Sequence, residues 1–132
     1  MFVYHRVVRI QDTDATGVVY FANELQMGLE VFEEFLLIKG FSLGSMVRQG
    51  KFFLPIVHTK ADFKAPLFVG DKVELTLNFP HIGTTSFTHA STLRKEGKEV
   101  GEVLIVHAVY CPKAQQAIPI PDELRSCLTD QP

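Results

Sequence analysis

Only one long segment of this chain has helical periodicity, and it lies between stretches that have the pattern of β-strands. In residues 21–39, one set of side chains recurs at steps of three and four, which predicts one face of a helix. That set is Phe21, Leu25, Gly28, Leu29, Phe32 and Leu36, and the glutamates expected on the other side are Glu24, Glu30, Glu33 and Glu34. Lys39 and Gly40 predict the end of the helix. Asn23 followed by Gln26 is a possible capping box at its start.

Strand patterns surround this helix. Residues 2–10 combine β-branched and aromatic residues, and residues 11–19 have the composition of a loop. After an irregular or briefly helical segment at 41–53, four more strands are predicted, at 54–63, 71–79, 85–93 and 100–110. The last of these is apolar enough to be expected to be buried on both faces. The segment "KEGK" at 95–98 predicts a hairpin turn, and the proline-marked tail predicts one closing helical turn.

A single apolar-faced helix and a largely antiparallel sheet must bury each other. The simplest arrangement is an α+β hotdog fold, in which a sheet of about five strands wraps around one long central helix. A chain of 132 residues predicts a single domain, residues 1–132. Gly28 costs about 1 kcal/mol relative to Ala in the middle of a helix, so we expect it to let a strand come close. An open sheet has unpaired edges, and we therefore expect a homo-oligomer, a dimer or a tetramer.

Composition excludes several classes of function. The chain has 13 basic and 15 acidic residues, so its charge gives no reason to expect nucleic acid or an anionic membrane as a partner. Neither a signal peptide nor an apolar run of roughly 18 residues is present, which argues against membrane insertion. Two cysteines without a CxxC motif favour a reduced, cytoplasmic location. The five histidines lack metal-ligand spacing, so no metal site is predicted.

The most distinctive short motif is "DTDATGVVYF" at residues 12–21, between the first predicted strand and the helix. Asp, Thr and Gly are ordinary turn formers, so a structural turn with Gly17 at its bend is one interpretation. A calcium loop is a second, because the motif imitates the start of an EF-hand, but Asn23 stands where that loop requires a bidentate Glu. A phosphate-binding loop is excluded, because the required glycine and lysine pattern is absent.

A catalytic interpretation of the same motif combines a carboxylate with the start of a helix. A carboxylate beside an apolar wall is expected to be partly desolvated, which raises its pKa. The first turn of the following helix offers backbone N–H groups without intrahelical acceptors, and these can hold a developing oxyanion. The motif therefore contains the groups needed for attack on a carbonyl carbon.

The segment "DTDATGVVYFANELQMGLEVFEEFL" resembles the opening signature of the 4-hydroxybenzoyl-CoA thioesterase family of hotdog proteins. The shared elements are two Asp one residue apart, a Gly three residues later, an apolar pair, an aromatic residue and the central helix. Downstream, "FFLPIVHTKADFKAPLFVGDKVEL" resembles the second and third strands of that family, including a turn from Ala65 to Asp71. The resemblance covers nearly the whole chain and implies hydrolysis of acyl-CoA thioesters.

The resemblance assigns roles to individual residues. The catalytic carboxylate of the family, a nucleophile or general base, falls on Asp14. The backbone N–H that polarises the thioester carbonyl falls on Phe21, and Asp12 is expected to shape the loop. Substrate contacts are assigned to Gly17, Val19, Tyr20, His58 and Thr59. Coenzyme A is part of the substrate, so no separate cofactor is expected. Residues 81–87 contain no Lys or Arg, so contacts to its phosphates are expected from Lys60, Lys64 or Arg94.

Phe21 and the segment around "LPIVH" are also similar to one subgroup of the family, the 1,4-dihydroxy-2-naphthoyl-CoA thioesterases of phylloquinone and menaquinone synthesis. This subgroup is the preferred interpretation. A broad-range or short-chain acyl-CoA thioesterase of the same family is an alternative, as is a non-catalytic module that binds an acyl thioester. A hotdog dehydratase is disfavoured, because it needs a His near the helix and none lies between residues 6 and 57.

Overall fold

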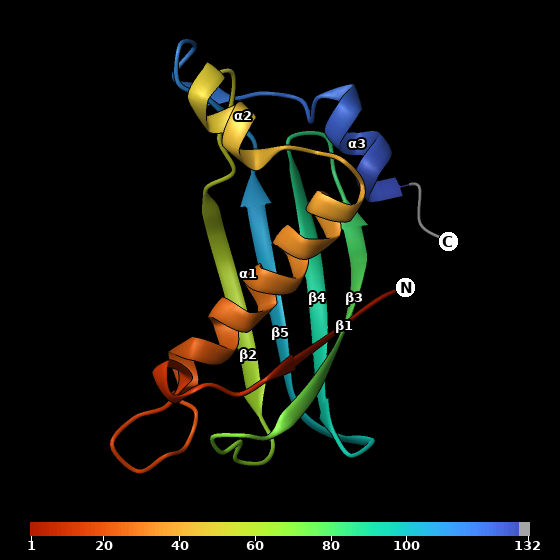
Figure 1. Cartoon of the computed structure of the whole chain (residues 1–132). Coiled ribbons are helices and arrows are strands. Elements are labelled where there is room, and N and C mark those ends of the chain that lie inside the picture. The colour runs from red at the N-terminus through yellow and green to blue at the C-terminus, as the bar shows by residue number, and fades with distance from the viewer. Residues whose placement is uncertain (130–132) are drawn as a thin grey trace.

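A computed structural model describes residues 1–129, in which helix α1 (Phe21–Ile38) crosses one face of a five-stranded antiparallel sheet (Figure 1). The strands are β1 (Phe2–Val7), β2 (Ile56–Phe63), β3 (Lys72–Ile82), β4 (Ser86–Lys95) and β5 (Lys98–Ala108). Their order across the sheet is β1-β3-β4-β5-β2, so β1 and β2 form the two edges. The predicted order of strand, loop, long helix and four strands is confirmed, and so is the α+β hotdog architecture.

Smaller elements close the two ends of the sheet. Helix α2 (Leu43–Gln49) begins where the Ser42 hydroxyl accepts a hydrogen bond from the Ser45 N–H, and it ends at Gly50 in the left-handed region. Helix α3 (Asp122–Thr129) is longer than the single closing turn that the sequence predicts. The short strands β6 (Tyr110–Cys111) and β7 (Gln116–Ala117) pair with each other, and the 3-10 helix η1 (Ile10–Asp12) follows β1.

The face of α1 that packs on the sheet differs from the predicted one. Its buried residues are Glu24, Met27, Gly28, Val31, Phe32, Phe35 and Leu36. Gly28, Phe32 and Leu36 were expected there, but the placement of Glu24 on the solvent side is wrong. Apolar residues cover more than half of this helix, so its period alone does not determine the edge of the buried stripe.

Gly28 has the predicted packing role. A Cβ atom at this position would lie 2.7 Å from Cγ1 of Val103 on β5, closer than such atoms approach each other. The absence of a side chain therefore lets α1 lie directly on β5.

Two histidines are buried in the core beneath α1. His89 on β4 and His107 on β5 approach within 3.0 Å through their Nε2 atoms, and Nδ1 of His107 lies 3.0 Å from the Leu54 carbonyl oxygen. Phe32 stacks on both imidazole rings. Burial, and next the neighbouring His107, lowers the pKa of His89 from 6.5 to about 3. The fold therefore keeps His89 neutral.

The edge strand β2 is exposed along almost its whole length on both faces. Strand β5 beside it buries its helix-facing side, but Glu102 on the opposite side is exposed, so the expectation of a strand buried on both faces is wrong there. Within residues 1–129, no helix is both long enough and apolar enough to cross a membrane.

Candidate active site

The motif at residues 12–21 forms a tight, bridged loop directly before α1. Thr13 and Val19 form an antiparallel bridge, and the Asp14 N–H donates to the Val18 carbonyl oxygen at 3.0 Å. The Gly17 N–H donates to the Asp14 carbonyl oxygen at 3.1 Å, and the φ of Gly17 is +80°, which favours glycine. The turn interpretation of this motif is therefore confirmed, and Asp14 lies at its first position.

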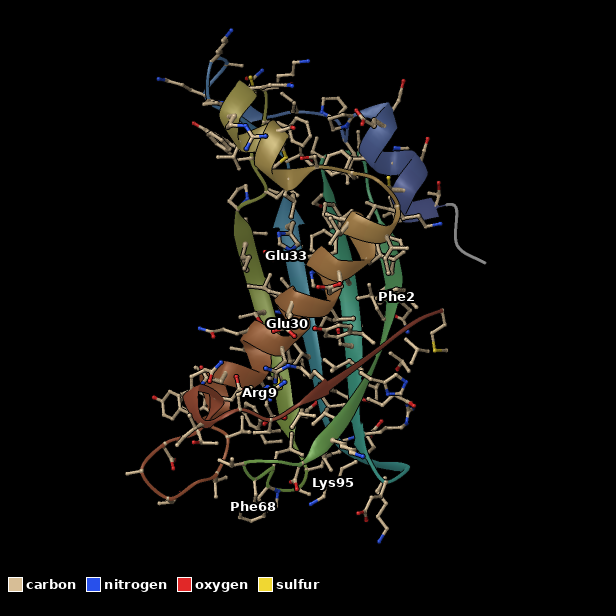
Figure 2. All side chains as sticks on the ribbon, viewed as in Figure 1. Phe2, Arg9, Glu30, Glu33, Phe68 and Lys95 are labelled. Carbon is tan, nitrogen blue, oxygen red and sulfur yellow. The ribbon has the colours of Figure 1, made fainter. Side chains whose placement is uncertain are left out.

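The second resembling motif, the turn from Ala65 to Asp71, holds this loop in place. The Val19 N–H donates to the Leu67 carbonyl oxygen at 2.8 Å, and the Val69 N–H donates to the Gly17 carbonyl oxygen at 3.3 Å. Within the turn, a carboxylate oxygen of Asp71 accepts a hydrogen bond from the Phe68 N–H at 2.8 Å. Figure 2 shows Phe68 at the end of the sheet where this loop lies. Two motifs far apart in the sequence thus form one end of the molecule.

Asp12 shapes the loop, as expected. Its Oδ2 accepts hydrogen bonds from the Arg9 N–H at 2.7 Å and from the Arg6 guanidinium at 3.0 Å. Its carbonyl oxygen accepts from the Tyr20 N–H at 3.1 Å and from the Asn23 side chain at 2.8 Å. Because Asn23 binds Asp12 in this way and Tyr20 is the N-cap, the predicted capping box at Asn23 is wrong.

Asp14 is exposed to solvent, so the expectation of a desolvated carboxylate is wrong for the single chain. Its Oδ1 accepts hydrogen bonds from the hydroxyl and the N–H of Thr16, the latter at 2.8 Å. These two bonds favour the charged form and lower the pKa of Asp14 below its ordinary value, opposite to the predicted direction. Asp14 is therefore an ionised carboxylate at neutral pH.

The start of α1, seven residues after Asp14 in the chain, offers free backbone donors. Tyr20 has extended backbone angles, and Phe21 is the first helical residue. Among residues 1–129, the N–H groups of Phe21 and Ala22 have no hydrogen-bond acceptor, as the geometry of a helix start allows. Both groups are thus able to bind an oxyanion.

A hollow of about 370 Å³ opens beside the helix start. Its lining is mostly apolar and consists of Val18, Val19, Phe21, Glu24, Phe63, Lys64, Ala65, Pro66 and Leu67. The rings of Phe21 and Phe63 meet edge to face, with centroids 6.1 Å apart, and both are about half exposed. This is the place where a flat apolar group could lie next to the Phe21 N–H.

Glu24 is the residue of this site that the sequence analysis missed. It is 5% exposed, and burial raises the pKa of its carboxyl group from 4.5 to about 7. The signal was present in the sequence, because Glu24 lies three, four and seven residues before Met27, Gly28 and Val31. The expectation that Glu24 faces solvent rests on its charge alone, although its spacing places it on the apolar face of the helix.

His58 and Thr59 are not brought to the helix start within one chain. His58 pairs with Val106 and lies on the sheet face opposite α1, whereas the Thr59 hydroxyl donates to the Leu104 carbonyl oxygen at 3.1 Å. Thr59 is four residues from Phe63, roughly 13 Å along an extended strand. Their part in substrate binding stays a prediction. By contrast, Asp14, Gly17, Val19, Tyr20 and Phe21 all lie in the loop and helix start described above.

The basic residues considered for phosphate contacts differ in their partners. Lys64 forms ion pairs with Glu99 and Glu102, and Arg94 donates to the Thr76 hydroxyl at 3.2 Å. Lys60 has no ion pair within residues 1–129. In the same part of the chain, no three His, Cys, Asp or Glu side chains gather in a way that could hold a metal ion.

Comparison with known proteins identifies the class of this fold and loop. The family model of the thioesterase-like superfamily matches residues 8–128, and the chain belongs to this superfamily. A curated relative from Nostoc punctiforme, named 1,4-dihydroxy-2-naphthoyl-CoA hydrolase, is 36% identical over 123 residues, covering 93% of this chain and 83% of that protein. A relative of the same name from Thermosynechococcus vestitus is 34% identical over 130 residues, covering 98% and 89%.

Solved structures agree with this result. The 1,4-dihydroxy-2-naphthoyl-CoA thioesterase from Synechocystis superposes with a TM-score of 0.93 at 29% identity, covering 99% of this chain and 98% of that one. A gentisyl-coenzyme A thioesterase superposes with a TM-score of 0.85 at 27% identity, covering 98% and 100%. The resemblance to a thioesterase family, inferred from the sequence, is confirmed.

Proposed function

We propose that this chain hydrolyses an aromatic acyl-CoA thioester, most specifically 1,4-dihydroxy-2-naphthoyl-CoA, within a single domain of residues 1–132. The observation that carries the proposal is the hydrogen-bonded loop in which an ionised Asp14 stands seven residues before the first of two free N–H groups at the start of α1. Relatives that bear the name of this activity, covering more than nine tenths of the chain, support the choice of substrate.

In the proposed reaction, the acyl group lies in the apolar hollow and its carbonyl oxygen points at the Phe21 N–H. Asp14 attacks the thioester carbon or activates a water molecule that does so, and its lowered pKa keeps it in the charged form that both roles require. The developing oxyanion is held by the N–H groups of Phe21 and Ala22. The thiolate of coenzyme A leaves without needing a strong general acid, and in the nucleophilic route water then hydrolyses the acyl–Asp14 anhydride to the free acid and the carboxylate.

We further propose that a second copy of the chain completes the site. Strand β2 is an unpaired sheet edge with exposed Ile56, Val57 and Phe63, and such edges are usually covered. Pairing of two β2 edges would bring His58 and Thr59 of one copy towards the helix start of the other, and would remove water from Asp14. The cytoplasmic location remains a proposal that rests on the low cysteine content.

The test measures thiol release from 1,4-dihydroxy-2-naphthoyl-CoA, benzoyl-CoA and a short-chain aliphatic acyl-CoA. Asp14→Asn is expected to lower kcat by about 10²–10³-fold or more, the effect typical of losing an oxyanion donor, with an unchanged circular dichroism spectrum. Asp122→Asn, an exposed substitution in α3, serves as the control. Parental rates in Asp14→Asn would refute the role of this residue, and binding without turnover of any thioester would identify a non-catalytic module instead.

A further inference from the structure

The carboxyl group of Glu24 is buried without a partner at the start of α1. Within residues 1–129, its Oε1 is inaccessible to solvent and has no hydrogen bond. Burial is the single cause that raises its pKa, so no basic side chain compensates it. A buried polar group without a partner is destabilising, and its presence calls for an explanation.

The sheet leaves room for this carboxyl group. Gly101 on β5 faces Glu24, and a Cβ atom at position 101 would lie only 2.6 Å from Oε1 of Glu24. The backbone of Gly101 does not have a positive φ, so its conformation does not require glycine. Such a Cβ atom would also lie 3.2 Å from the carbonyl oxygen of Asp62 on β2, so glycine at position 101 leaves space both for the Glu24 carboxyl group and for the neighbouring strand.

Glu24 also borders the hollow beside the helix start, but its inaccessible Oε1 lies against Gly101, so a bound group would reach the carboxyl group through Oε2. Glu24 lines the hollow together with Phe21 and Phe63, whose rings provide flat apolar walls. Lys64 at the same hollow is already engaged by Glu99 and Glu102. A bound group that satisfies Glu24 thus combines a flat apolar body with a polar substituent that is not anionic.

We propose that Glu24 is a specificity-determining residue that hydrogen-bonds a phenolic hydroxyl of the acyl group bound in this hollow. A hydroxyl can accept from the protonated carboxyl group and donate to the ionised one, whereas an anionic substituent would be repelled by the ionised form. An unsubstituted ring would leave the carboxyl group unpaired, and sites of this kind discriminate strongly against the analogue that lacks the polar group. This inference rests on the proposed thioesterase function and specifies its substrate as a hydroxylated aryl-CoA.

The experiment compares kcat/KM for two matched pairs of substrates, 4-hydroxybenzoyl-CoA with benzoyl-CoA and 1,4-dihydroxy-2-naphthoyl-CoA with 2-naphthoyl-CoA. The parent is expected to prefer the hydroxylated member of at least one pair by about tenfold or more. Glu24→Met, of similar length but apolar, should lower that preference by about tenfold, while Glu24→Gln should keep most of it. Gly101→Ala, which displaces the carboxyl group from the other side, should lower it as well. Glu33→Gln, exposed on the same helix, should leave it unchanged.

The outcomes separate this inference from the proposed function. If the parent hydrolyses none of the four thioesters, the proposed function fails. If it hydrolyses both members of each pair equally well, or if Glu24→Met keeps the parental preference, only the role of Glu24 is refuted. If Glu24→Met dissociates the oligomer and leaves the preference intact, Glu24 pairs with another copy of the chain rather than with substrate, and the inference is equally overturned.

Discussion

Replacing Glu24 with Gln should change how the stability of this protein depends on pH. Burial raises the pKa of Glu24 from 4.5 to about 7, so the folded chain binds a proton that the unfolded chain releases between these values. The stabilising contribution of the protonated group is fully present below pH 4.5 and is lost as the pH rises through about 7. One pH unit corresponds to about 1.4 kcal/mol, so ionising Glu24 costs the folded state about 3 kcal/mol in total.

The magnitude can be measured by urea unfolding of both proteins at pH 5 and pH 8, at one fixed protein concentration. Gln has nearly the same shape but does not ionise, so any constant effect of the substitution cancels between the two pH values. The free energy of unfolding of Glu24→Gln, relative to the parent, should rise by about 2 kcal/mol from pH 5 to pH 8. Glu33→Gln, exposed on the same helix, is the control and should run parallel to the parent.

The pH dependence of the parent alone would not reveal the effect of Glu24, because a second buried group, His89, changes the stability in the opposite direction. His89 is neutral in the folded chain, so it destabilises the fold at acid pH, whereas Glu24 destabilises it at alkaline pH. The two effects largely offset each other in the parent between pH 5 and pH 7. If Glu24→Gln and the parent show the same dependence on pH, Glu24 is not buried as an unpartnered acid, and the reasoning is refuted.

Two further predictions concern the packing of α1 and the buried histidines. Gly28→Ala should destabilise the fold, because overpacking against Val103 typically costs about 1–3 kcal/mol and exceeds the gain of about 1 kcal/mol in helix propensity. In a Val103→Ala background the same substitution should become neutral or stabilising. A double-mutant cycle in which the two substitutions are simply additive would contradict the contact. The low pKa of His89 gives stability that is present above pH 6.5 and lost as the pH falls towards about 3, so the parent should lose about 2 kcal/mol from this group between pH 7 and pH 5. Relative to the parent, His89→Phe should gain about 2 kcal/mol of unfolding free energy from pH 7 to pH 5 in urea unfolding, with exposed His5→Gln as the control. An identical pH dependence of His89→Phe and the parent would show that His89 is not held neutral.

The sequence by itself determined the order and type of the main elements. The predicted helix at 21–39 is the observed Phe21–Ile38, and the predicted strand at 71–79 lies within one residue of its observed start at Lys72. These features are local, because the spacing of apolar residues depends only on the pitch of a helix or the pleat of a strand. The loop of Asp14 and its position before the helix were predicted for the same reason, since the turn residues and the helix start are neighbours in the chain.

Only the tertiary structure decided which side of each element meets which partner. The rotation of α1 that buries Glu24, and the β2–β5 register that turns His58 away from α1, depend on contacts between segments far apart in the sequence. The raised pKa of Glu24 follows from that rotation, whereas the lowered pKa of Asp14 follows from its exposure and from hydrogen bonds to Thr16 within the loop, and both differ from the predicted directions or placements. An exposed carboxylate in a hydrogen-bonded turn keeps a low pKa, whereas a carboxyl group packed between a helix and a sheet has a raised one, because solvent access depends on how distant segments pack together and not on the local sequence.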